Sequence, residues 1–276
     1  MGLSDRILNI PIPVVSFLMI LTIALPMVTP IGLPIKIGSM TKAGYDIILG
    51  LSEGSVVLMS YGVSPAGVTE VGTGAKALVY HVLSEGHKLI LVGPAVDNPM
   101  FVEKDIPPIA NMLNKQYGID WVHLGYYAGV EMGLAAILSD ISSVYTTDHR
   151  GNKLQDLPLM QEVKGAADID LHICVTFSAD MPSQLARQVA APYGIPIILL
   201  CDGVTGTIAT PYYPTQIQSI MMSMRGSAEY ELLIKRPAEA TGGMDSISLS
   251  YLYLTLLLVI TNIATFYKRG EKKEER

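Results

Sequence analysis

Residues 55–93 read SVVLMSYGVSPAGVTEVGTGAKALVYHVLSEGHKLILVG, and this stretch predicts a strand, a helix and a second strand. Ser55–Tyr61 and Lys88–Val92 are nearly continuous apolar runs, as expected of strands that are buried on both faces of a sheet. Between them, Pro65–Glu85 carries apolar residues at helical spacing, and Gly86 is of the type that closes helices. Two strands joined by a helix are the repeating unit of a parallel sheet.

The same alternation continues to about residue 236 and defines the fold class. We predict further strands at Asp120–Tyr126, Asp170–Phe177 and Ile195–Cys201, and a short one at Ser142–Thr146. Further helices are expected at Pro107–Tyr117, Val130–Ser139, Leu157–Lys164, Pro182–Tyr193 and Thr215–Lys235. This order indicates an α/β domain that is Rossmann-like, with a mostly parallel sheet and helices on both faces.

Two uncharged segments near the chain ends predict membrane helices. The chain has 276 residues, of which 16% are charged, whereas about 25% is usual in soluble domains. Val14–Val28 is almost wholly apolar, and Ile247–Tyr267 contains no charge. The alternatives are a cleaved signal peptide and a buried core helix. We therefore expect an N-terminal transmembrane anchor at 1–36, a Rossmann-like α/β domain at 37–244, and a C-terminal transmembrane helix with a basic tail at 245–276.

The charges beside these segments favour one orientation in the membrane. The tail after the second segment, KRGEKKEER, is rich in Lys and Arg. The basic residues near the segments on the domain side are Lys36, Lys42, Lys235 and Arg236. Because basic residues near span ends tend to stay in the cytoplasm, the counts favour a two-pass protein of the cell membrane with cytoplasmic termini and an extracytoplasmic domain.

The loops that follow the strands form the predicted site. Right-handed crossovers place every strand-to-helix loop at one edge of a parallel sheet, and ligands bind at that edge in such folds. Glycines there permit close backbone approach, and helix N-termini favour anions. The candidate residues for a ligand crevice are Gly62, Ser64, Gly93, Asp97, Gly125, Ser178, Asp180, Asp202 and Gly203. The alternative is that these residues only make turns and helix caps.

No motif of known chemistry indicates an enzyme. Gly72–Ala77 (GTGAKA) fits a dinucleotide-binding fingerprint, but it lies inside the predicted helix rather than directly after a strand. The sequence contains neither a P-loop nor a G-x-S-x-G elbow. The histidines do not cluster, and Cys174 and Cys201 lie in apolar runs, so we predict no metal and no cofactor. With a net charge of −6 and no basic stripe, nucleic acid is not an expected partner.

Two polar segments are open to more than one interpretation. Thr147–Asp156 is predicted to be an exposed loop, in which Asp148-His149-Arg150 is either solvated or in contact with a partner. In the final helix, Arg225–Glu231 (RGSAEYE) contains a glycine and small residues. Such residues reduce helix stability, so they favour close helix packing over chemistry, within the chain or between subunits.

The hexapeptide Gly125-Tyr126-Tyr127-Ala128-Gly129-Val130 resembles a segment of an uncharacterised prokaryotic family of membrane-anchored α/β proteins. The similarity is local and covers a small part of the chain. It carries no catalytic residues. What the resemblance implies is a bacterial or archaeal membrane protein with a Rossmann-like domain.

The two anchors, the small-residue helices and the missing catalytic motifs favour a non-catalytic function. We expect a subunit or scaffold that forms homo-oligomers or assembles with other membrane proteins beside the lipid bilayer. One alternative is a sensory domain that binds a small-molecule ligand in the strand-end crevice. Another is an enzyme acting on a small anionic or lipid-derived substrate, with Asp180 or Asp202 as acid or base.

Overall fold

The computed structural model describes residues 3–274, and the chain divides into two compact units. One unit is the α/β domain, Ile35–Arg236. The other contains the helical segments up to Pro34 and from Pro237 onward. The strands of the chain's described part therefore all belong to the first unit.

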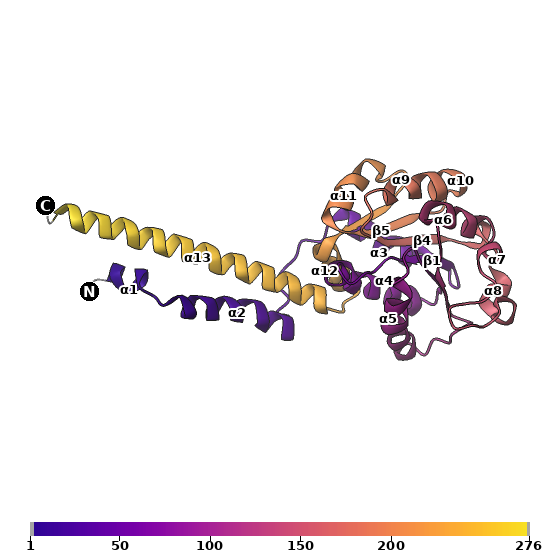
Figure 1. The fold of residues 1–276 in the computed structure, drawn as a ribbon, viewed down its shortest axis with the longest axis horizontal. Helices are drawn as coiled ribbons and strands as arrows, with labels where there is room; N and C mark the ends of the chain where they lie inside the picture. Colours follow the sequence, from indigo (N-terminus) through magenta and orange to yellow (C-terminus); the bar gives the residue numbers. More distant parts are fainter. Residues whose placement is uncertain (1–2, 275–276) are drawn as a thin grey trace. The chain divides into compact units, whose positions relative to one another are not determined.

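Six parallel strands form the sheet of the α/β domain (Figure 1). They are β1 (Val56–Tyr61), β2 (Lys88–Gly93), β3 (Trp121–Tyr126), β4 (Leu171–Thr176), β5 (Ile197–Cys201) and β6 (Ser219–Met222). Their order in the sheet is β3-β2-β1-β4-β5-β6, and every pairing is parallel. This is the doubly wound order, in which the winding reverses between β1 and β4. The predicted α/β class is confirmed.

The helices cover both faces of the sheet, because the strands are buried on both sides and need apolar partners on each. One core layer contains residues of α6 (Val130–Ser139), α7 (Ile141–Val144), α8 (Pro158–Glu162), α9 (Met181–Leu185) and α11 (Gly203–Ala209). The other contains residues of α3 (Ser39–Gly50), α4 (Thr73–Ser84), α5 (Asn98–Met112) and α12 (Ser223–Leu233). A π-helical turn, Val68–Gly72, leads into α4, and α10 (Ala191–Tyr193) precedes β5.

The C-terminal part of the domain differs from its prediction. The single helix expected at Thr215–Lys235 is wrong, since the structure places β6 there and starts α12 at Ser223. The strand forms because Ser219 is fully buried and its hydroxyl donates to the Met40 carbonyl oxygen at 2.8 Å. Gly44 of α3 leaves the room for this contact, since a Cβ at Gly44 would lie 2.5 Å from Ser219 Oγ. This long-range pairing overrides the local pattern.

Three smaller differences have local causes. The short strand expected at Ser142–Thr146 is instead the helix α7, which Asp140 caps by accepting the Ser142 N–H at 2.9 Å. The helix expected at Pro107–Tyr117 begins earlier, at Asn98, and Pro107 lies inside it. The chain after β5 forms α11, which is not among the predicted helices and is capped by Asp202.

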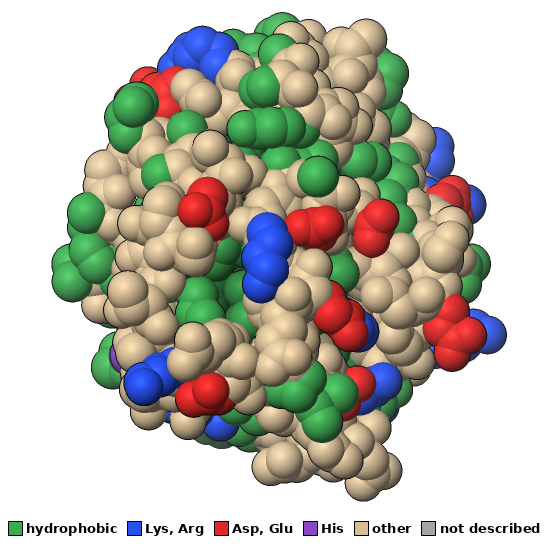
Figure 2. Space-filling model, turned by 90° about the vertical axis from the view of Figure 1, so that its right-hand side faces the viewer, with side chains coloured by type: hydrophobic (Ala, Val, Ile, Leu, Met, Phe, Trp, Pro, Cys, Tyr) green, Lys and Arg blue, Asp and Glu red, His purple; other side chains and the backbone are tan. Residues whose placement is uncertain are grey.

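The surface of the molecule carries both signs of charge. Figure 2 shows one face, on which Lys and Arg side chains lie among Asp and Glu side chains with apolar patches between them. Exposed ion pairs on the domain include Lys42 with Asp46 at 2.6 Å and Arg187 with Glu131 at 3.0 Å. Such exposed pairs add little to stability, so their role in the fold is small.

The second unit consists of α1 (Leu3–Leu8), α2 (Ile12–Val28) and α13 (Glu239–Glu274). Among the described residues, one segment is long and apolar enough to cross a membrane, namely Glu239–Lys268 with a mean hydropathy of 1.8. The expectation of two such helices is therefore not met at the N-terminal end, where α2 is apolar but has 17 residues. Prolines limit its length, because Pro11 precedes the helix and Pro30 follows it closely.

Within this unit, α2 and α13 are joined by hydrogen bonds from α13 side chains. Ser246 donates to the Ile23 carbonyl oxygen at 2.9 Å, and Tyr253 donates to the Val15 carbonyl oxygen at 2.8 Å. The Asp245 carboxylate is fully buried and accepts three successive backbone N–H groups at 2.7–2.9 Å, from Ile31, Gly32 and Leu33. Charge-assisted bonds of this kind are strong, so Asp245 fixes the segment after α2 to the start of α13.

Candidate functional site

The fold brings all nine predicted site residues to the carboxyl edge of the sheet. Those at or after the ends of β1, β2 and β3 are Gly62, Ser64, Gly93, Asp97 and Gly125. Those after β4 and β5 are Ser178, Asp180, Asp202 and Gly203. At least one of these side chains has a structural role, since Asp202 caps α11 by accepting the Thr205 N–H at 3.3 Å. The edge is therefore built as the sequence predicts, but shared location alone does not make a pocket.

The chain itself packs at the switch point between β1 and β4, where ligands bind in doubly wound sheets. The Gly62 N–H donates to the Val175 carbonyl oxygen at 3.0 Å, which extends the β1–β4 ladder beyond Tyr61. Next to it, the Phe177 ring lies against Gly67, where an added Cβ would come 1.7 Å from a ring carbon. Buried Asn98 ties in the loop after β2 by donating to the Val63 carbonyl oxygen at 2.8 Å.

Exposed apolar side chains occur on both sides of the switch point along this edge. We call them the apolar rim, which consists of Val96, Met100, Tyr126, Val130, Met132 and Val204. Three of these side chains are highly exposed, at 80% for Val96, 72% for Met132 and 68% for Val204. They lie at the end of β3, in the loop after β2, or in the first turns of α5, α6 and α11. Exposed apolar side chains at one edge of a domain favour a contact surface there.

The rim loop Gly125–Val130 has an unusual backbone. Gly125 and Gly129 have φ values of +95° and +79°, and Val130 has a φ of +34°. Glycine adopts such angles freely, but a β-branched residue does so at a steric cost. The loop therefore holds a strained residue at the carboxyl edge, where strain often accompanies function.

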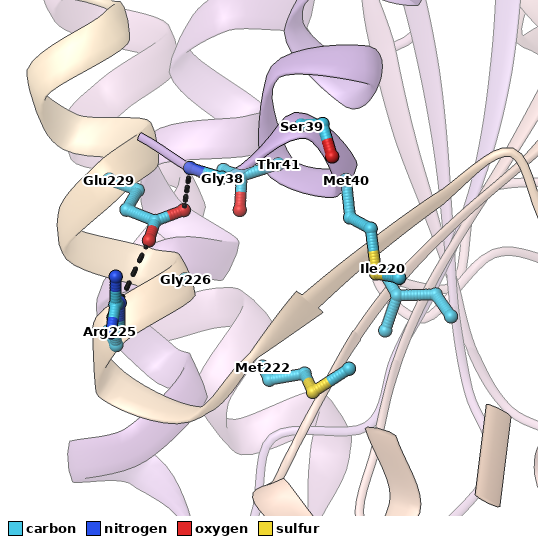
Figure 3. A pocket seen from close by; sticks show the side chains of 9 residues that line it. All are labelled: Gly38, Ser39, Met40, Thr41, Ile220, Met222, Arg225, Gly226 and Glu229. Atoms are coloured by element: carbon cyan, nitrogen blue, oxygen red, sulfur yellow. Dashed lines mark hydrogen bonds and ion pairs between the residues drawn. The ribbon is translucent and has the colours of Figure 1, made fainter. Parts of the chain in front are cut away.

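A pocket that the sequence did not predict lies between α3, β6 and α12 (Figure 3). It has a volume of about 330 Å³. Its lining residues are Gly38, Ser39, Met40, Thr41, Ile220, Met222, Arg225, Gly226 and Glu229. The nearly buried Glu229 carboxylate accepts the Gly38 N–H at 3.0 Å and the Arg225 Nε–H at 3.0 Å. Arg225 and Glu229 stand four residues apart in one helix, which was the only available signal in the sequence.

The polar loop predicted over Thr147–Asp156 is not simply solvated. Asp148 is buried and accepts the Tyr117 hydroxyl at 2.6 Å, so its predicted exposure is wrong. His149 and Arg150 are exposed, and the Arg150 guanidinium lies 3.8 Å from the centre of the Tyr117 ring. These contacts hold the loop against the edge strand β3.

A charged cluster continues from this loop onto α5. Glu103 pairs with Arg150 at 2.9 Å and with His123 Nδ1 at 2.8 Å. Burial lowers the pKa of His123 to about 4, so the imidazole is neutral at physiological pH. The His149 ring lies 4.6 Å from it, centre to centre. Across the described residues, no group of three or more His, Cys, Asp or Glu side chains is placed to hold a metal ion.

The packing of Phe177 at the switch point can be tested by substituting Gly67. Gly67→Ala should lower the free energy of unfolding by about 1–3 kcal/mol, because the new methyl group collides with the Phe177 ring. In a Phe177→Ala background the same change should cost almost nothing. Gly50→Ala is the control, since no atom lies within 4 Å of a Cβ at that position. Denaturant unfolding in mild detergent measures all four. A Gly67→Ala variant as stable as Gly50→Ala would contradict the packing.

Comparison with known proteins finds no match. No family profile fits the chain, and no curated protein or solved structure is significantly similar to it. The fold assignment therefore rests on the strand order and the parallel pairing, and the site rests on its own geometry.

Proposed function

We propose that this chain is a membrane-anchored, non-catalytic subunit whose α/β domain docks another protein at its carboxyl edge. One observation carries the proposal. At the place where doubly wound folds usually bind small molecules, the Phe177 ring packs on Gly67, while apolar side chains of the rim are exposed along the same edge. Burying the exposed apolar side chains of the rim against a partner would release more free energy than placing a small ligand at the switch point.

The composition of the apolar rim suits a protein interface. Met and Tyr are enriched in such interfaces, and the rim contains Met100, Met132 and Tyr126. Unbranched methionine side chains adapt to the shape of a partner. Burial of apolar area contributes about 25 cal/mol per Å², so a few such side chains supply a useful part of the binding free energy.

The charge at this edge indicates the partner's chemistry. The strand-end loops contain Asp97, Asp180 and Asp202 and no Lys or Arg, and the basic side chain of Arg187 beside them pairs with Glu131. Two copies packed rim to rim would bring these carboxylates together, which is unfavourable. The partner we propose is therefore a different protein with an apolar patch and basic residues beside it, and a bilayer of anionic lipids is disfavoured for the same reason.

The proposal includes two passes through the membrane. α13 supplies the longer crossing, and α2 is packed along it within the same unit through Tyr253 and Ser246. α2 spans about 26 Å at 1.5 Å per residue, close to the hydrocarbon thickness of about 30 Å. Basic residues in the C-terminal tail favour cytoplasmic termini and a domain on the opposite side.

Docking at the rim is tested with charged substitutions. We expect the wild-type chain, extracted from its native membranes in mild detergent, to migrate with a second protein. Met132→Asp and Val204→Asp should each weaken the complex by about tenfold or more, because they place a charge in an apolar contact. Met112→Asp is the matched control, an exposed methionine at the end of α5 that lies away from the rim. Native mass spectrometry and sedimentation measure the complex.

Two results would contradict this function. One is a wild-type chain that migrates alone or only with copies of itself. The other is a complex that Met132→Asp and Val204→Asp leave unchanged, or that Met112→Asp weakens equally. Raising the salt concentration from 0.05 to 0.5 M should also weaken the complex, because screening reduces attraction between the rim carboxylates and basic groups of the partner.

The two-pass topology has its own test. Single cysteines introduced at Ser4 and at Gly270 should react with membrane-impermeant maleimide in inside-out vesicles, which expose the cytoplasmic face, and not in intact cells. A cysteine at Lys153 in the domain should react in intact cells. The native cysteines, Cys174 and Cys201, are buried and give a low background. Labelling at Ser4 and Gly270 from opposite faces would exclude two crossings.

A further inference from the structure

We propose that the pocket between α3, β6 and α12 binds a small organic carboxylate with a short apolar chain. The pocket is separate from the apolar rim, because the two share no residue. It is independent of the docking function, so the failure of either leaves the other standing. Its volume of about 330 Å³ lies within the range of about 300–1,000 Å³ that is typical of small-molecule sites.

The floor of the pocket is apolar. Figure 3 shows Met40, Ile220 and Met222 directed into the same space from the first turn of α3 and from β6. Ile220 is almost fully buried, and Met40 and Met222 are half-buried and pack against the core. A hydrocarbon chain on this floor would be removed from water, and the two methionines can adjust to its length.

A buried hydroxyl faces the same space. Thr41 is only 3% exposed, and Figure 3 shows its Oγ1 directed toward the pocket. This hydroxyl can donate to a ligand oxygen that enters the pocket.

Arg225 supplies the positive charge at the mouth of the pocket. Its side chain is largely exposed, and its Nε–H is already donated to Glu229. The buried Glu229 carboxylate is thereby neutralised, with a further bond from the Gly38 N–H. The remaining guanidinium N–H groups can donate to an anion, although Nη2 also lies 3.5 Å from the Lys36 carbonyl oxygen.

These groups together select a carboxylate. One oxygen of a ligand carboxylate can accept from Thr41 and the other from Arg225, with the chain on the methionine floor. A phosphate dianion would lie close to Glu229, and one shared arginine does not compensate for that repulsion. An uncharged alcohol would leave the guanidinium without a new partner. The ligand class is therefore a short-chain monocarboxylate.

The test uses methionine-methyl NMR of the full chain in nanodiscs, with sodium hexanoate as the probe. We expect hexanoate to shift the Met40 and Met222 methyl signals in a saturable way and to leave the Met132 signal unchanged. Arg225→Gln should weaken binding by about tenfold or more, and Thr41→Val by about threefold or more, as expected of a charged and a neutral hydrogen bond. Arg150→Gln, which removes a distant arginine, should leave the affinity unchanged.

Matched ligands decide the outcome. Hexanol, which lacks the charge, should bind at least about tenfold more weakly than hexanoate. The site is overturned if hexanoate gives no saturable shift, if hexanol binds as well, or if inorganic phosphate shifts the same methyl signals. It is also overturned if both Thr41→Val and Arg225→Gln keep the wild-type affinity. The remaining methionine signals report whether each variant is folded. If Arg225→Gln is destabilised because Glu229 has lost its partner, Thr41→Val still tests the site.

Discussion

The contact between the loop after β1 and the end of β4 governs what this domain can do. The Gly62 N–H bonds to the Val175 carbonyl oxygen, and the Phe177 ring lies on Gly67. A doubly wound sheet normally keeps this point open, since the reversal of winding separates the two loops there. Here the Phe177 ring occupies part of that space by packing on Gly67. The binding surfaces that we propose therefore lie around the switch point and not at it.

Those surroundings divide into two different environments. Around β2, β3 and β5, the edge presents the apolar rim with carboxylates and no basic side chain in its loops. Beyond β6, the edge continues into a pocket lined by an arginine, a threonine and two methionines. The first environment suits a large partner, and the second suits a small anion. The pocket depends on β6, because this strand leads into α12 and holds the neighbouring turn of α3 through the bond from Ser219 to Met40.

Much of this architecture could be predicted from the sequence, because continuous apolar runs and glycine-closed helices are local signals. The strands β1 to β5 and the carboxyl-edge location of residues such as Asp97 and Asp202 follow from them. β6 could not be predicted, since the buried Ser219 hydroxyl bonds to Met40, which is far away in the chain. The pocket was missed for the same reason. The packing of Phe177 on Gly67 could not be predicted either, because it depends on the distance between two residues that meet only in the folded chain. α2 was expected to be long enough to span, and prolines shorten it.

The central claim is that the rim carries a protein partner with basic residues beside an apolar patch. Its most direct test is crosslinking in native membranes with a reagent that joins cysteine to lysine. A cysteine at Val204 can be used because Cys174 and Cys201 are buried. We predict one dominant adduct between Val204→Cys and a different protein, and none from Met112→Cys. An adduct only with a second copy of the chain, or equal adducts from both positions, would contradict the account.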